Sequence, residues 1–162
     1  MTAGDKVRVQ TFVQVPLQEC FDIFTLQIDA WWRHGRAYRV GGPHEGALHL
    51  EPRAGGRVFQ EYGEHGTGVH AIGTVLAWSP PDHFAFSWRA INFAPGDPST
   101  RVDVWFADSG SGTRVTLEHQ GFAALRDDHP VRHGAPAHAF IATMGRWWGA
   151  ILTAHRLYAE DM

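Results

Sequence analysis

Three histidines and two aspartates lie close together between positions 126 and 138 and supply ligand types suited to a metal ion. The histidines are His129, His133 and His138, and the carboxylates are Asp127 and Asp128. Zinc and nickel accept imidazole nitrogens and carboxylate oxygens as ligands. Prolines at positions 130 and 136, however, interrupt the helical spacing that would align the first two histidines. We therefore expect a solvated polar loop here, with no native metal site and no other cofactor.

Four other side chains are candidates for proton transfer. His155 lies on the apolar side of an expected C-terminal helix, and His49, Glu61 and His70 lie in expected strands. An imidazole and a carboxylate that meet in a low-dielectric cavity have shifted pKa values and can transfer protons. The spacing does not show that any two of them meet. A core histidine bonded to a backbone carbonyl is the favoured interpretation of His155, while inward and outward orientations of His49 and Glu61 both stay open.

The chain is rich in aromatic residues, with 7 tryptophans and 10 phenylalanines among 162 residues. Core packing is the favoured interpretation of most of these rings, and a ligand cavity is the alternative, because small-molecule pockets are lined mostly by apolar side chains. Trp105 has the opposite parity to Val104 and Phe106, so we expect it to face outward. The candidates for lining a cavity are Trp31, Trp32, Phe59, Ile72, Phe86, Trp88, Phe140, Met144, Trp147, Trp148, Ile151 and His155.

Several other kinds of site find no support in the sequence. Cys20 is the only cysteine, which excludes an intramolecular disulfide and a paired-cysteine zinc site, and we expect it to be a small buried hydrophobe. Gly55 and Gly56 lack the following Lys-Ser/Thr of a phosphate-binding loop, so they indicate a turn. No serine stands in a Gly-x-Ser-x-Gly motif, and serine hydrolase chemistry is therefore unsupported.

Length and charge exclude further classes of protein. A chain of 162 residues is typical of one domain, which we expect to span residues 1–162. The formal net charge is -3 and no basic block occurs, so we expect no nucleic-acid partner. The start of the chain has no apolar signal region, and no apolar run is long enough to span a bilayer. We expect a cytoplasmic protein without a membrane span.

The elements that must position these side chains begin with a strand. Apolar and polar residues alternate over positions 7–15, as in a half-buried strand. Pro16 then precedes a short amphipathic helix, and Asp29 is expected to cap a second short helix that carries Trp31 and Trp32. After a loop rich in glycine and proline, strands are expected at 47–51, 57–62, 69–78, 83–91, 102–106 and 115–117.

The last element is a long amphipathic helix. After Pro136, apolar residues recur at spacings of 4, 3, 4, 4 and 3, from Phe140 to Tyr158. A helix of roughly six turns with so broad an apolar face must lie on a large apolar surface, and the sheet is the candidate. Helices segregated from an antiparallel meander indicate the α+β class.

Several stretches resemble those of a known family and occur in the same order as in that family. Together they cover nearly the whole chain. They are residues 15–24, 31–32, 51–57, 73–81, 112–119 and 145–152. The sequence resembles the START-like, Bet v 1-like superfamily, in particular the SRPBCC-domain proteins similar to the activator of Hsp90 ATPase. The resemblance implies a helix-grip fold, in which a curved antiparallel sheet wraps a long C-terminal helix and leaves a cavity between them.

The resemblance leaves the function open among three hypotheses. Members of the superfamily bind lipids, sterols or plant hormones, cyclise or dehydrate polyketides, or stimulate a chaperone, and no catalytic motif carries over. We favour a protein that binds an apolar or aromatic small molecule. The alternatives are an enzyme that acts on such a ligand by acid–base catalysis, with His155, His70 or Glu61 as candidates, and a chaperone partner. The resemblance alone suggests the chaperone partner, and exposed aromatic residues suggest self-association.

Overall fold

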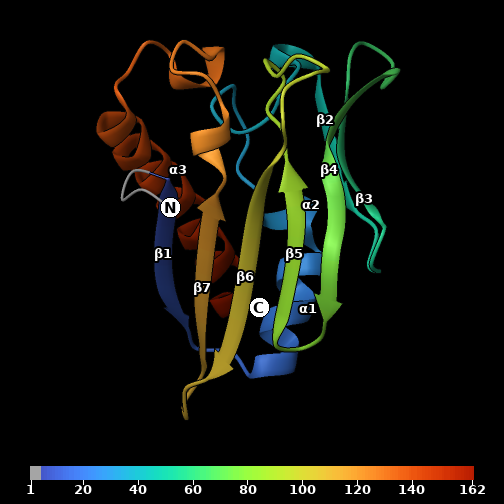
Figure 1. Cartoon of the computed structure of the whole chain (residues 1–162). Helices are drawn as coiled ribbons and strands as arrows, with labels where there is room; N and C mark the ends of the chain where they lie inside the picture. Colours follow the sequence, from blue (N-terminus) through green and yellow to red (C-terminus); the bar gives the residue numbers. More distant parts are fainter. Residues whose placement is uncertain (1–4) are drawn as a thin grey trace.

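A seven-stranded antiparallel sheet dominates the computed structural model, which describes residues 5–162 (Figure 1). The strand order across the sheet is β1-β7-β6-β5-β4-β3-β2, so that only the β1–β7 pair joins strands distant in sequence. The strands are β1 (Lys6–Val13), β2 (Glu45–Leu50), β3 (Arg57–Tyr62), β4 (Gly68–Ser79), β5 (His83–Trp88), β6 (Thr100–Asp108) and β7 (Thr113–Gln120).

The helices lie together on the inner face of the curved sheet (Figure 1). They are α1 (Leu17–Leu26), α2 (Ile28–Trp31) and α3 (Ala137–Glu160), with short 3₁₀ turns η1 (Gly42–His44), η2 (Phe122–Ala124) and η3 (Pro130–Arg132). Prolines at positions 16 and 136 immediately precede α1 and α3, where a residue without an N–H costs no helical hydrogen bond. Among the described residues, no helix combines the length and hydrophobicity that crossing a bilayer requires. This arrangement confirms the predicted order of elements and the α+β helix-grip fold.

Two irregularities in β4 bend the sheet. The pairing of β4 with β3 shifts between Ala71 and Gly73, and its pairing with β5 shifts between Val75 and Ala77. An extra residue in one strand of a pair bends that strand and increases its twist. A Cβ atom on Gly73 would lie 1.7 Å from the carbonyl oxygen of Ser87, so no side chain fits between β4 and β5 at this point.

His119 is fully buried, and both of its ring nitrogens are hydrogen-bonded. Its Nδ1 accepts from Nε1–H of Trp148 at 3.0 Å. An indole can only donate, so the ring proton lies on Nε2, which donates to Oγ1 of Thr100 at 2.7 Å. The Thr100 hydroxyl in turn donates to the carbonyl oxygen of Trp88 at 3.0 Å. These bonds join α3 to β7, β6 and β5.

His155 is equally buried but lacks such partners. Its ring packs against Phe24 and Trp31, with ring centroids 4.8 and 5.2 Å apart. Neither ring nitrogen has a well-formed hydrogen bond among residues 5–162, and the predicted backbone partner is present only as a weak interaction with Cys20. Burial lowers the pKa of His155 to about 4, and the nearby Cys20 backbone opposes this shift only in part. Burial likewise lowers the pKa of His119 to about 3.

We expect Gly73→Ala to lower the free energy of unfolding by more than about 2 kcal/mol, because the new Cβ would displace the backbone of β5. Gly149→Ala is the matched control, since a Cβ at this position in α3 meets nothing within 4 Å. It should stabilise the protein by about 0.5–1 kcal/mol. Urea denaturation measures both, and equal effects of the two variants would contradict the close approach of β4 and β5.

We expect stability to fall in mild acid because His119 and His155 are neutral in the folded state. Their folded pKa values lie below the unfolded value of about 6.5, so the unfolded chain binds protons first as the pH falls. The loss is roughly 2 kcal/mol per buried histidine between about pH 6.5 and pH 5. Urea denaturation over this range measures it.

His155→Leu should remove about half of this pH dependence. His65→Gln changes an exposed histidine and should remove none of it. If His155→Leu kept the full pH dependence of the parent protein, the burial of a neutral His155 would not be its cause.

Candidate functional site

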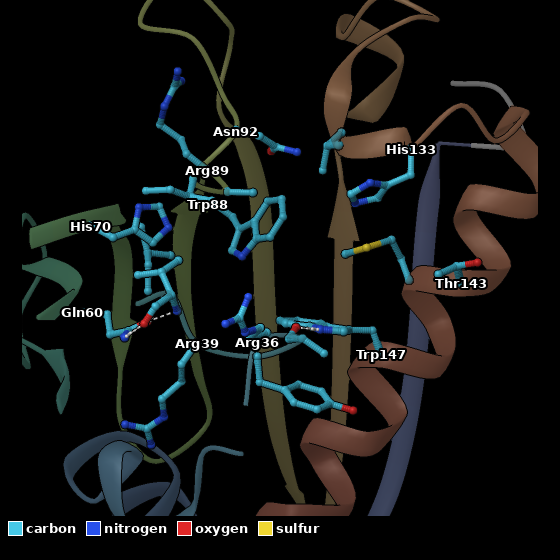
Figure 2. Close-up of a pocket in the computed structure, with 18 of the residues that line it drawn as sticks. Arg36, Arg39, Gln60, His70, Trp88, Arg89, Asn92, His133, Thr143 and Trp147 are labelled. Carbon is cyan, nitrogen blue, oxygen red and sulfur yellow. Dashed lines mark hydrogen bonds between the residues drawn. The ribbon is translucent and has the colours of Figure 1, made fainter. Parts of the chain in front are cut away.

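A cavity of about 540 Å³ lies between the sheet and α3 (Figure 2). Its size falls within the range of roughly 300–1,000 Å³ that is typical of small-molecule pockets. The sheet contributes one wall through β2–β5, and the first half of α3 forms the opposite wall. Trp32, the loop at residues 36–40 and the segments 89–92 and 131–135 complete the lining.

The structure divides the predicted cavity residues into two groups. Trp32, Ile72, Trp88, Phe140, Met144 and Trp147 line the cavity. Trp31, Phe86, Trp148, Ile151 and His155 lie in the packed core instead, and Phe59 lines a second hollow beside α2. The division arises because the buried stripe of α3 is longer than the cavity, so the second half of the helix packs against α1 and α2.

The polar part of the lining comes mainly from residues that the sequence did not mark. Two of the polar lining residues were candidates in the sequence: His70 as a group for proton transfer, and His133 as a metal ligand. The other polar or charged residues in the lining are Arg36, Tyr38, Arg39, Gln60, Arg89, Asn92, Arg132 and Thr143. Most of them lie in connecting segments. Their position in loops rich in glycine and proline could have marked them as binding candidates, because loops on a rigid scaffold often carry binding residues.

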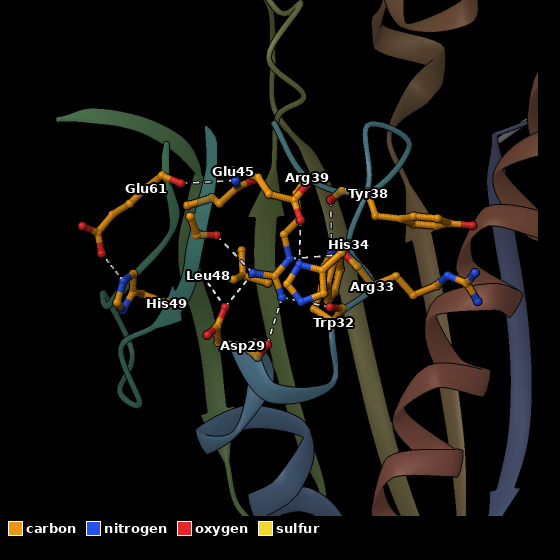
Figure 3. A network of polar contacts seen from close by, with 12 residues as sticks. Asp29, Trp32, Arg33, His34, Tyr38, Arg39, Glu45, Leu48, His49 and Glu61 are labelled. Carbon is orange, nitrogen blue, oxygen red and sulfur yellow. Dashed lines mark hydrogen bonds and ion pairs between the residues drawn. The ribbon is translucent and has the colours of Figure 1, made fainter. Parts of the chain in front are cut away.

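Arg39 anchors the loop that follows α2 (Figure 3). Arg39 is only 3% exposed, and its guanidinium donates to Oδ1 of Asp29 at 2.6 Å and to the carbonyl oxygen of Trp32 at 2.8 Å. Asp29 also accepts from the N–H of Leu48, at 2.8 Å. The prediction that Asp29 caps α2 is wrong, because α2 has Gln27 at its N-cap and the Asp29 carboxylate binds Arg39 and β2 instead.

The Asp29 carboxyl is therefore held in its charged form. Partial burial alone would raise its pKa, but the hydrogen bonds from Leu48 and Arg39 outweigh burial, so the pKa lies below its usual value. A carboxylate and a guanidinium in this arrangement satisfy each other, and a buried charge is tolerated only when it is paired and hydrogen-bonded.

Three further contacts hold the same loop against the cavity walls. Trp147 donates from Nε1 to the carbonyl oxygen of Ala37 at 2.6 Å, and its ring stacks on Tyr38. Trp32 donates from Nε1 to the carbonyl oxygen of Tyr38 at 3.1 Å. The Gln60 amide forms two bonds of 2.9 Å with the backbone of Val40. The loop is thus tied to α3, to the segment after α2, and to β3.

The candidates for proton transfer do not come together in one place. His49 and Glu61 form a hydrogen-bonded pair, but both side chains are about 40% exposed and neither lines the cavity. His155 is fully buried against Phe24 and Trp31. His70 alone of the four lines the cavity, and burial lowers its pKa, which a hydrogen bond with the Arg89 backbone opposes. The cavity therefore holds one neutral imidazole from this set.

Asn92 adds a second unusual polar group to the lining. Its amide oxygen is buried and has no hydrogen-bond partner within residues 5–162. A buried acceptor without a partner costs free energy, and a ligand hydroxyl or N–H would satisfy it.

The histidine-rich segment before α3 is more ordered than the sequence indicated. His129 is 1% exposed, donates from Nε2 to Oδ2 of Asp97 at 2.8 Å, and accepts from the N–H of Val131 at 3.0 Å. The expectation of a wholly solvated loop is wrong for His129, because both ring nitrogens hold the loop in place. His133 adopts a φ of 49° and lines the cavity. In the part of the chain that the structure describes, no three His, Cys, Asp or Glu side chains gather as metal ligands would.

Comparisons with known proteins agree with this fold. Residues 14–140 match the family model described as activator of Hsp90 ATPase homolog 1-like protein. A structure from Mesorhizobium loti is 17% identical over 97% of this chain and 98% of its own, with a TM-score of 0.66. A Staphylococcus aureus protein of unknown function is 10% identical over 96% of this chain and 93% of its own, with a TM-score of 0.69.

A further solved structure has a reaction in its name. It is an anthrahydroquino-gamma-pyrone synthase solved as a complex, 27% identical over 88% of this chain and 99% of its own, with a TM-score of 0.55. No curated protein sequence matches the chain.

Proposed function

The chain belongs to the activator of Hsp90 ATPase homolog 1-like family, and from this premise we propose that it binds an aromatic small molecule in the cavity between the sheet and α3. The observation that carries this proposal is the convergence of three indole rings, those of Trp32 after α2, Trp88 in β5 and Trp147 in α3. The rings of Trp88 and Trp147 are only half-buried, so part of their surface stays uncovered by protein. A flat apolar ligand would cover it and gain the favourable geometry of aromatic pairs.

The arrangement of the rings also favours binding. Trp147 is fixed by its hydrogen bond to Ala37 and by stacking on Tyr38, and Trp88 lies next to the buried His119 ring. Rigid side chains lose little conformational entropy when a ligand binds. The unpartnered amide oxygen of Asn92 would then fix the orientation of the ligand, as the few polar groups of apolar pockets do.

We expect Met144→Trp to weaken binding of the neutral probe N-phenyl-1-naphthylamine at least tenfold, because the larger ring would occupy the cavity. Its free energy of unfolding should change by less than about 1 kcal/mol, since the added atoms enter open space. Probe fluorescence and urea denaturation measure the two quantities.

Ile151→Trp is the matched control on the same helix, because Ile151 is fully buried and does not line the cavity. Overpacking there should cost about 1–3 kcal/mol or more. If the probe failed to bind the parent protein, or bound Met144→Trp equally well, the proposed binding function would be refuted.

A second candidate function is acid–base catalysis of ring closure on such a ligand. The observation that favours it is the likeness to the pyrone synthase together with a neutral imidazole, His70, in the cavity. A neutral histidine can accept a proton from a phenol as its oxygen attacks, and can return the proton to the carbon that becomes a carbanion. No oxidant or other reactant is needed for such an isomerisation.

The test of this candidate is the conversion of 2′-hydroxychalcone into flavanone, which closes a pyranone ring without change of mass. We expect the protein to accelerate this conversion at neutral pH, and His70→Gln to abolish the acceleration while the neutral probe still binds. His65→Gln, in an exposed turn, is the control and should keep full activity. A conversion rate equal to that in buffer, or unaffected by His70→Gln, would exclude His70 as a catalytic base for this reaction.

A further inference from the structure

We propose that the ligand is an aromatic acid, and that its anionic group binds Arg36. This inference rests on the proposed binding function and names the chemical class of ligand. It follows from the distribution of charge around the cavity, the free hydrogen-bonding capacity of one guanidinium, and the way its loop is held.

The cavity is basic although the protein as a whole is acidic. Arginines at positions 36, 39, 89 and 132 line it, whereas none of the 17 acidic residues does so among the residues described. The protein as a whole carries a formal charge of -3. An anionic ligand is therefore favoured inside the cavity, because walls of low dielectric focus the field of like charges that line a cleft.

Three of these arginines already have partners for their guanidinium groups. Arg39 binds Asp29. Arg89 donates to the backbone of Ala94 and Asp97. Arg132, which is 6% exposed, donates to the carbonyl oxygens of Phe122, Leu125 and Arg126. Their head groups are engaged by the protein and offer no open donors, and the charge of Arg39 is balanced by Asp29.

Arg36 differs from the other three because its guanidinium has neither a hydrogen bond nor an ion pair with any described residue. Arg36 is an exposed residue that lines the cavity, and Figure 2 shows it between Gln60 and His70 on the sheet side and Trp147 on the side of α3. A guanidinium presents several N–H donors in a planar fork that matches a carboxylate or similar anion. In this position the fork is available to a ligand whose ring lies against the indoles.

The loop that carries Arg36 is fixed before any ligand arrives. The next residue, Ala37, accepts the hydrogen bond from Trp147, and Tyr38 accepts the one from Trp32. Arg39 is buried against Asp29 three residues after Arg36. The backbone at Arg36 is thus positioned by contacts on its C-terminal side, and the same Trp147 that would stack on the ligand sets the place of the cation. Trp147 would contact the ring of the ligand while Arg36 binds its anionic group.

The experiment compares two fluorescent probes that share one scaffold. N-Phenyl-1-naphthylamine is neutral, and 8-anilino-1-naphthalenesulfonate adds one anionic group to it. We expect the parent protein to bind the sulfonate at least tenfold more tightly than the neutral probe. Arg36→Gln should weaken sulfonate binding about tenfold, because a hydrogen-bonded charge is lost, and should change binding of the neutral probe less than twofold. Arg36→Lys should retain part of the preference, because it keeps the charge without the planar fork.

Arg114→Gln is the control, since Arg114 is exposed on β7 and does not line the cavity. Equal affinity of the parent protein for the two probes, or an Arg36→Gln variant that loses both probes alike, would overturn the role of Arg36 and leave the binding function standing. Failure of both probes to bind the parent protein would refute the binding function itself.

Competition against the bound sulfonate separates an aromatic acid from a fatty acid. We expect 2-naphthoate to displace the sulfonate at lower concentration than dodecanoate does, because the cavity offers ring surfaces. The opposite order would replace the aromatic acid by an aliphatic one and so contradict the proposal.

Discussion

The distance between α3 and the sheet depends on one chain of hydrogen bonds that runs through the protein interior. Trp148 donates to His119, His119 donates to Thr100, and Thr100 donates to the backbone at Trp88. Each donor in this chain has an acceptor, and removing any member would leave a buried polar group unpaired. This series of hydrogen bonds starts at Trp148, next to the cavity residue Trp147, and ends at the cavity residue Trp88. The two walls are thereby held at a fixed separation.

The loop at residues 36–40 is also held by buried hydrogen bonds, but here the groups that form them are charged. The Arg39 guanidinium is buried only because Asp29 and several backbone carbonyls surround it (Figure 3). A buried cation in that position admits few alternative loop conformations, since each alternative would separate it from its partners. The rigid loop in turn places Ala37 under Trp147. Thus the polar interior of the protein orders the surface on which a ligand would lie.

The sequence predicted those parts of the structure that local periodicity controls. Alternation along the strands and the apolar stripe from Phe140 to Tyr158 predicted the order of elements, and prolines 16 and 136 predicted where two helices begin. The same periodicity showed which face of α3 is buried but not how far the sheet stands from each turn, so Trp148 and His155 were grouped with Met144. The role of Arg39 was missed because it depends on partners that only the folded loop brings together.

The bend in β4 has a consequence for how this architecture can diversify. Gly73 and the two pairing shifts act through the main chain, so the hollow of the sheet does not require any one lining side chain. Substitutions at Ile72, Met144 or Arg36 would alter the chemical character of the interior while its outline persists. In a protein of this kind the backbone sets the shape of the cavity, and the lining side chains set its chemical character. New ligand preferences can arise in it by replacement of a few wall residues, without a new scaffold.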